Sequence, residues 1–244
     1  MLDIPYASRD RTFDDFDPPD RDIPLRPSLW QPKLVLVPAW RLDARARLFK
    51  RLVDIAVSLI GLTVLAIAMP FLMLAIRLDS PGPLLFRQQR VGLHGAAFTM
   101  LKFRTMRAVP LEQGVLRQAT RRDPRVTRVG SWLRRYSLDE LPQLINVLRG
   151  DMSIVGPRPH AHGTRAGGRL FEEVTHQYAA RHCVKPGMTG LAQIRGWRGE
   201  TDTEDKLLRR VDCDLEYIAT WSPGLDLSII WRTAGTVMRM RNAY

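Results

Sequence analysis

Two adjacent carboxylates, Asp139 and Glu140, are the most chemically informative residues of the sequence. The spacing of Ser137 and Glu140 is that of a capping box, which predicts a helix over residues 138–148. A start with Asp139 as the N-cap would instead place Pro142 in the first helical turn. In both registers the helix dipole favours ionised carboxylates, which could serve as a nucleophile and as a magnesium ligand. The alternative is that the two carboxylates only cap the helix.

Three basic side chains could contact a phosphate or a diphosphate. Arg158 lies between Pro157 and Pro159, and two prolines lower the entropy cost of fixing its guanidinium against a phosphate. Lys102 and Arg104 alternate with apolar residues, so a strand would direct both toward one face, which suits a diphosphate. The alternatives are a solvated surface arginine and a solvated sheet face.

Other chemical signatures are weak or missing. The histidines and Cys183 do not have the spacing of a structural zinc site. The sequence contains neither a GxxxxGKS/T loop nor a GxGxxG motif, so P-loop and Rossmann interpretations lack their motifs. Two cysteines, Cys183 and Cys213, cannot form a disulfide framework, which favours a reducing compartment.

The charge balance points to anionic partners. The 244 residues include 37 Lys and Arg against 25 Asp and Glu, a formal net charge of +12, and 32 of the basic residues are arginine. Arginine suits bidentate contacts with phosphates and carboxylates. Charge alone leaves nucleic acid, nucleotide phosphates and an anionic membrane surface open. The apolar share of 45% argues against a wholly disordered chain.

The chain divides into three parts by composition. Residues 1–40 are rich in Pro, Asp and Arg and predict a disordered arm, with a short strand at 33–37 and no secretory signal. Residues 41–78 carry a basic cluster followed by the 22 uncharged residues 55–76. As a helix, this run would be about 33 Å long, enough to cross a bilayer core. Residues 79–244 are expected to form the remaining domain.

Two features of the apolar run argue against a simple crossing. Basic residues lie on both sides of it, so the positive-inside rule asks both flanks to stay in the cytoplasm. Pro70 interrupts the run and removes a helical hydrogen bond. A re-entrant helix, broken at Pro70 and leaving by the face it entered, meets both demands. A kinked spanning helix is the main alternative, since bilayers tolerate proline, and a buried helix of a soluble core is another.

The rest of the chain predicts an α/β fold that is mostly helical with a small sheet. Short strands are expected at 84–86 and 98–103 around a turn at Gly92 and Gly95, and a loop at 107–120. Helices are expected at 131–136, 138–148, 205–220 and 225–240. The last helix mixes apolar and Arg residues, which fits either a membrane interface or an amphipathic helix packed on the core.

In combination, these motifs resemble the bacterial sugar transferase family, the monotopic phosphoglycosyl transferases. The resemblance runs from about Arg45 to Tyr244 and is specific because the motifs occur in a fixed order. The motifs are Asp79–Pro83 followed by Phe86-Arg87-Gln88, Lys102–Met106, Asp123–Thr127, Ser137–Pro142, Asn146–Pro159 and Lys185–Gly190.

The resemblance implies an enzyme that transfers a sugar 1-phosphate from a UDP-sugar to polyprenyl (undecaprenyl) phosphate and releases UMP. It implies that Asp139 attacks the β-phosphorus to form a covalent phosphosugar intermediate, that Glu140 holds Mg2+, and that Arg158 contacts phosphate. Pro70 corresponds to the residue that breaks the family's re-entrant helix. The implied location is the bacterial inner membrane, among its lipids, with the catalytic domain on the cytoplasmic face. No nucleic-acid partner is implied, and the oligomeric state is left open.

Two departures from the family pattern stand out. Met69 precedes Pro70 where many relatives have Ser, whose hydroxyl can satisfy a freed carbonyl. The chain also lacks the multi-span N-terminal region of long members, so it resembles the short forms or a catalytic half. Residues 190–201 and the ending at 242–244 are similar to members that move glucose or galactose phosphate, with glucose favoured. A non-enzymatic, membrane-anchored basic scaffold is the main alternative function, and nucleic-acid binding is the third.

Overall fold

The computed structural model describes residues 44–107, 123–199 and 201–240, with side chains to 236. The predicted disordered arm, the strand at 33–37 and nearly all of the predicted loop at 107–120 lie outside the described residues. The α-helices are α1 (Ala44–Asp79), α2 (Arg128–Arg135), α3 (Gln143–Arg149), α4 (Phe171–Val174), α5 (Leu191–Ile194), α6 (Glu204–Thr220) and α7 (Pro223–Met240). The strands are β1 (Leu85–Val91), β2 (Ala97–Phe103), β3 (Ser153–Val155), β4 (Arg165–Ala166), β5 (Arg169–Leu170) and β6 (Gly187–Thr189). Short 3-10 turns are η1 (Leu93–Gly95), η2 (Leu138–Glu140) and η3 (His176–Cys183).

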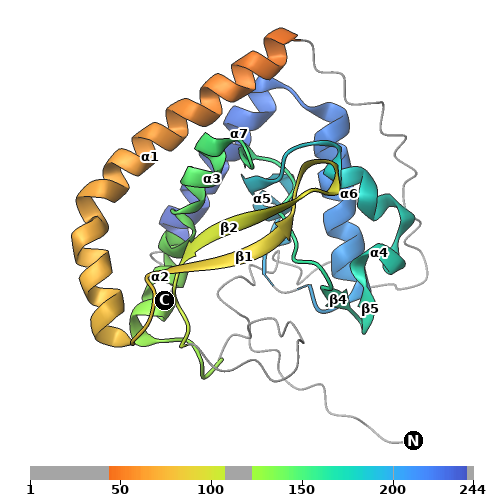
Figure 1. Cartoon of the computed structure of the whole chain (residues 1–244). Coiled ribbons are helices and arrows are strands. Elements are labelled where there is room, and N and C mark those ends of the chain that lie inside the picture. The colour runs from red at the N-terminus through yellow and green to blue at the C-terminus, as the bar shows by residue number, and fades with distance from the viewer. Residues whose placement is uncertain (1–43, 108–122, 200, 241–244) are drawn as a thin grey trace, which may run out of the picture.

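The long apolar helix α1 runs along one side of the molecule, and the β1–β2 hairpin, α3 and α6 lie on its inner side (Figure 1). Its 36 residues continue through Pro70, and Figure 1 shows that the helix bends in its C-terminal half, where the sequence predicted a break. A proline removes one hydrogen bond and clashes with the preceding turn, and either a kink or a break relieves that clash.

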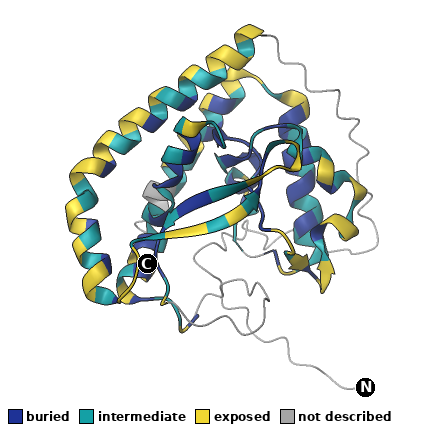
Figure 2. Ribbon diagram, in the orientation of Figure 1, coloured by how far each residue is buried: buried dark blue, intermediate teal, exposed yellow. Residues whose placement is uncertain are grey.

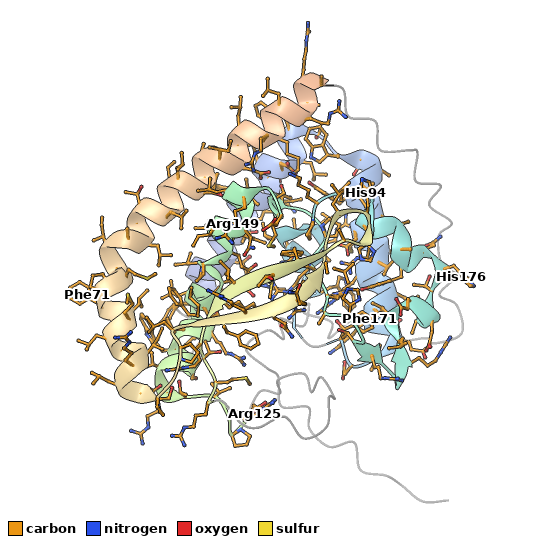
Figure 3. The ribbon with its side chains drawn as sticks, viewed as in Figure 1. Phe71, His94, Arg125, Arg149, Phe171 and His176 are labelled. Carbon is orange, nitrogen blue, oxygen red and sulfur yellow. The ribbon has the colours of Figure 1, made fainter. Side chains whose placement is uncertain are left out.

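Only one face of α1 is covered by protein. Figure 2 shows exposed residues along its whole outer side, and only 11% of its most apolar 18-residue window is buried. Phe71 is 76% exposed and points away from the domain (Figure 3). The helix is long and apolar enough to cross a membrane. Its apolar outer face and low burial do not fit the core helix of a soluble protein, which buries its apolar face.

Both ends of α1 are hydrogen-bonded to the rest of the described chain. Near its start, Arg51 donates to the carbonyls of Val147 and Leu148, at 2.6 Å each, and so caps the C-terminal end of α3. One turn later, the carboxylate of Asp54 accepts the backbone N–H of Ile154 at 2.8 Å. At the other end, Asp79 accepts the backbone N–H of Val129 at 2.8 Å. These contacts tie the two flanks of the apolar run to one body.

The small-sheet prediction is confirmed in outline, but the strands form three separate pairs. Strands β1 and β2 form an antiparallel hairpin around η1, β3 pairs with β6 in parallel, and β4 pairs with β5 antiparallel. The β3–β6 pair needs glycine where the chains meet, because a Cβ on Gly187 would lie 2.1 Å from the backbone nitrogen of Gly156. The buried strand β3 lies just before the segment Pro157-Arg158-Pro159.

The predicted helix over 138–148 is wrong in its first turn. Residues Leu138–Glu140 form η2, and α3 begins only at Gln143 with Pro142 at its N-cap. Ser137 has φ 55° and its side chain makes no capping hydrogen bond, so the capping box does not form. The chain turns sharply at Ser137, whereas Leu141 and Pro142 have helical backbone angles. Both carboxylates therefore lie on a short 3-10 turn that leads into α3.

The two C-terminal helices confirm their predictions closely. Helix α6 spans Glu204–Thr220 and buries an apolar face, and α7 spans Pro223–Met240. On α7, Ile229 is fully buried whereas Trp231 is 81% exposed. The amphipathic helix packed on the core is therefore confirmed, and a contact of the exposed face with a membrane interface stays a prediction.

Candidate active site

A cleft of about 280 Å3 is lined by four residues that the sequence singled out, Lys102, Arg104, Asp139 and Arg158. Glu140 is not part of this lining but contacts two of its members, Lys102 and Arg158. Alternate residues of β1, the end of β2 and the segment that follows it, α2 and η2 form part of its lining. The 158–164 segment, the start of α4, the segment before α6 and Arg210 of α6 form the rest. One carboxylate, Asp139, and six cationic side chains line it: Arg90, Lys102, Arg104, Arg134, Arg158 and Arg210. An excess of cations around a single carboxylate suits an anionic ligand with a nucleophile beside it.

Asp139 is held on the turn η2 and is only 7% exposed. The left-handed conformation of Ser137 begins this turn, and Leu138, next to it, packs against the cluster formed by Leu65 and Phe103. Packing on one side and the cleft on the other fix where the Asp139 carboxylate can lie. A nucleophile needs this kind of fixed approach.

Glu140 forms a three-part charge cluster with Lys102 and Arg158. Its Oε1 accepts from Lys102 Nζ at 2.7 Å and from Arg158 Nη2 at 2.6 Å, and Oε2 accepts from Arg158 Nη1 at 3.3 Å. Burial alone would raise the pKa of Glu140, but the charges of Arg158 and Lys102 outweigh it and hold that pKa well below its usual value. Glu140 is therefore ionised, and neither basic residue is a solvated surface group.

Arg104 lies in the cleft wall and is 6% exposed. Its Nη2 donates to the carbonyls of Ser80 at 2.5 Å and Ile76 at 3.3 Å, which stabilises the C-terminal end of α1. Its Nε and Nη1 are buried without a hydrogen-bond partner among the described residues. Unused donors in a cleft wall are suited to an anionic ligand, and Arg104 therefore joins the end of α1 to the cleft.

The backbone around Arg158 is held from behind by a buried ion pair. Arg181 donates to Asp214 through Nε at 3.0 Å and Nη2 at 2.6 Å, and the same Nη2 donates to the carbonyl of Arg158 at 2.7 Å. Both partners of the pair are almost fully buried. The proline-flanked Arg158 is thus fixed by its prolines and by a contact to its own carbonyl.

Comparison with known proteins identifies this arrangement. The family model for bacterial sugar transferases matches residues 45–240, which include every residue of the cleft. This chain belongs to the bacterial sugar transferase family. The match begins one residue into α1 and ends with α7, so it contains all the helices and strands of the structure.

Three relatives of this chain illustrate the similarity. An undecaprenyl-phosphate glucose phosphotransferase of Komagataeibacter xylinus is 53% identical over 80% of this chain and 37% of its own length. A UDP-glucose:undecaprenyl-phosphate glucose-1-phosphate transferase of Escherichia coli K12 is 50% identical over 77% of this chain and 39% of its own length. An exopolysaccharide production protein PSS of Rhizobium leguminosarum bv. phaseoli is 50% identical over 75% of this chain and 92% of its own length. The chain spans about two fifths of the first two relatives.

Sequence reasoning missed several residues that line the cleft. No local sequence motif contains Arg90, Arg134 or Arg210. His160 was considered only as a possible metal ligand. A signal existed for Arg210, because it falls on the buried stripe of α6 between Leu207 and Val211 and a charge there needs a partner. Arg90 and Arg134 reach the cleft only through the packing of β1 and α2.

The carboxylates in the cleft fit a magnesium ion. Mg2+ is usually held by one or two carboxylates together with substrate phosphates and water, and does not require a full cage of protein ligands. Glu140, ionised and adjacent to Asp139, supplies a hard oxygen ligand of this type. The described residues contain no cluster of three His, Cys, Asp or Glu that could hold a metal. Any ion here would therefore depend on phosphate oxygens for the rest of its ligands.

Proposed function

We propose that this chain transfers a hexose 1-phosphate from a UDP-sugar to polyprenyl phosphate and releases UMP. The observation that carries the proposal is the cleft itself, in which one buried carboxylate, Asp139, lies among six cationic side chains. A diphosphate is the ligand that such a charge distribution accommodates. Two relatives are named as glucose phosphate transferases, so UDP-glucose is the leading donor, with UDP-galactose next.

In the first step, an oxygen of Asp139 forms a bond to the β-phosphorus of the UDP-sugar. The bond between that phosphorus and the bridging oxygen breaks, and UMP leaves with the electron pair. The cleft cations offset negative charge on the diphosphate, which would otherwise repel the approaching carboxylate. The product is a phosphosugar joined to Asp139.

In the second step, a phosphate oxygen of polyprenyl phosphate forms a bond to the same phosphorus. The bond to Asp139 breaks, which restores the carboxylate and yields a polyprenyl diphosphate sugar. A two-step route lets a soluble nucleotide and a membrane lipid react in turn at one cleft. Each step transfers the same phosphoryl group, so the same cations serve both.

Lys102 and Arg158 have a specific part in this account. They are paired with Glu140 in the structure, and a bound diphosphate would give their donors new anionic partners. Glu140 would hold Mg2+ with the substrate phosphates. Bound there, the ion would act as a Lewis acid that stabilises charge on the transferring phosphoryl group.

We further propose that α1 is a re-entrant helix whose two ends stay on the cytoplasmic side of the inner membrane. A spanning helix would place its two ends about 30 Å apart, on opposite sides of the hydrocarbon core. Here Arg51 and Asp54 at one end and Asp79 at the other contact the same polar domain. Such a domain cannot follow a helix through lipid without burying its charges there.

The experiment that tests the function is UMP release by detergent-solubilised protein with magnesium and undecaprenyl phosphate. A panel of UDP-sugars would identify the donor. We expect repeated turnover with UDP-glucose that requires both lipid and metal, and release of no more than one UMP per protein when the lipid is left out. A folded protein that releases no UMP from any UDP-sugar would refute the enzymatic proposal and favour the membrane-anchored scaffold.

A further inference from the structure

One buried hydrogen-bond donor in the cleft has no part in the proposed reaction. The ring of His160 lines the cleft and is 7% exposed. Its Nε2 is buried and has no hydrogen-bond partner among residues 44–107, 123–199 and 201–240. A buried polar atom without a partner costs free energy, so an unpaired one in a cleft wall points to a ligand.

The partners of Nδ1 determine the tautomer of His160. Arg181 Nη1 lies 2.6 Å from Nδ1, and a guanidinium can only donate, so Nδ1 accepts. The hydroxyl of Tyr178 approaches the same nitrogen at 3.2 Å. The ring proton is therefore on Nε2. Since the two nitrogens point to different sides of the ring, Nε2–H is directed away from Arg181.

The charges around His160 keep the ring neutral. Burial lowers the pKa of His160 well below its usual value, and the positive charges of Arg181, Arg210 and Arg90 lower it further. The ring also packs edge-on against Phe171, with centroids 4.8 Å apart. His160 is thus a rigid, uncharged donor whose position is fixed by the Arg181–Asp214 pair behind it.

Asp139 and His160 both line the cleft, and their surroundings are attached to different ends of β1. The Glu140 end lies beside Lys102, which pairs in register with Phe86 of β1. The His160 end is joined to Val91, whose N–H donates to the carbonyl of His160 at 3.0 Å. Val91 is five positions beyond Phe86 on β1, which is about 17 Å along the strand.

The geometry of an in-line displacement indicates where the sugar phosphate and the nucleotide of the donor would lie in the cleft. The attacking oxygen, the phosphorus and the leaving oxygen lie roughly on one line in phosphoryl transfer. With Asp139 as the attacking group, the leaving nucleotide extends away from Asp139, toward the other end of the cleft. Arg90 and Arg210 line that end and suit the charge of a nucleoside monophosphate.

We propose that His160 binds the UMP half of the nucleotide sugar by donating its Nε2–H to an acceptor oxygen of that half. This inference rests on the proposed function and extends it to nucleotide recognition. His160 is a binding residue for the leaving group and takes no proton in the reaction. Arg181 and Asp214 act through it as positioning residues.

Two substitutions of His160 separate the two ring nitrogens. His160→Asn keeps an acceptor near the place of Nδ1 and removes the Nε2 donor, whereas His160→Gln keeps an amide donor near the place of Nε2. His182→Asn is the matched control, because His182 packs edge-on against Tyr178 and does not line the cleft. Calorimetric titration with UMP on the purified full chain in detergent measures the affinity of each variant.

The expected result is a loss of about tenfold in UMP affinity for His160→Asn, the cost of one hydrogen bond, with His160→Gln and His182→Asn close to the wild type. The same ratio is expected in the KM for UDP-glucose, with little change in kcat or in the KM for the lipid. If His160→Gln loses more affinity than His160→Asn, the ring acts through Nδ1 and the inference is wrong. If the UMP affinity of His160→Asn is unchanged while its KM for UDP-glucose rises, His160 faces the sugar, which also overturns the inference.

The experiments distinguish a failure of the proposed function from a failure of the role proposed for His160. Wild-type protein that releases no UMP from any UDP-sugar would refute the proposed function whatever the His160 variants bind. Wild-type protein that turns over, with His160→Asn binding UMP as tightly, would refute the role of His160 alone. Circular dichroism of each variant in detergent confirms that the titrated protein is folded.

Discussion

Arg158 and Glu140 form a two-point ion pair in the cleft, with Nη2 to Oε1 at 2.6 Å and Nη1 to Oε2 at 3.3 Å. The same carboxylate accepts from Lys102 at 2.7 Å. Glu140 therefore holds the side chains of Lys102 and Arg158 close together, where both could contact a diphosphate. The three groups could exchange partners when the substrate binds, because each can make more than one hydrogen bond.

We predict that Glu140→Gln lowers turnover by roughly 100-fold, in the range seen when one group that stabilises transition-state charge is removed. A neutral amide is also a poorer magnesium ligand, so the metal concentration for half-maximal activity should rise. UMP release measured across a magnesium titration checks both effects. Glu172→Gln, an exposed position on α4, is the control. An unchanged magnesium requirement in Glu140→Gln would show that this carboxylate does not hold the metal.

The Arg181–Asp214 pair should be important for stability. We expect Asp214→Asn to destabilise the protein by about 3 kcal/mol, because it leaves the buried charge of Arg181 without its partner. Thermal unfolding in detergent measures the loss. Asp205→Asn breaks the more exposed pair with Arg209 and should change the unfolding temperature little. Equal unfolding temperatures for the two variants would contradict this assignment.

How much the sequence predicts depends on how local the cause is. Helices α6 and α7 and the hairpin follow from periodicity and turn residues close together in the chain, and all were predicted. The turn η2 was missed because Ser137 adopts a left-handed conformation that its capping-box spacing does not encode. Lys102 and Glu140 were both singled out, but their pairing spans 38 residues and depends on packing of β2 against η2.

The residues behind the cleft were less accessible to sequence reasoning. Arg181 meets Asp214 from 33 residues away, and neither lies in a recognisable motif. Lys50 was assigned to a basic flank, yet its ammonium donates to Asp226 at 2.7 Å inside the domain. Side chains that pair across the fold show as a charge on an otherwise buried face, which predicts that a partner exists without identifying it.

Acidic pH should weaken the fold through His182. Burial and then the charge of Arg181 lower the pKa of His182 from 6.5 to about 4. Between these values the unfolded chain binds a proton at His182 and the folded chain does not, so this contribution to stability is complete above 6.5 and declines as the pH falls toward 4. Unfolding temperatures from pH 7.5 to about 4.5 should fall less steeply for His182→Gln than for the wild type. Parallel curves would contradict the lowered pKa.

The two ends of α1 should be accessible from the same side of the membrane. In a background with Cys183→Ser and Cys213→Ser, we would introduce single cysteines at Arg47, Leu78 and Ile67, all exposed in the structure. A membrane-impermeant thiol reagent applied to inside-out vesicles should label the first two and spare Ile67, which lies in lipid. Labelling of Arg47→Cys and Leu78→Cys from opposite sides would establish a spanning helix instead.

The most direct test of the account asks whether Asp139 carries the transferred group. Wild-type protein incubated with UDP-glucose and magnesium, without lipid, should gain the mass of one phosphohexose on the peptide that contains Asp139, and release an equal amount of UMP. Asp139→Asn should remain folded and membrane-bound, gain no mass and release no UMP. Near-normal turnover by Asp139→Asn, or a phosphohexose on another residue, would contradict the central claim.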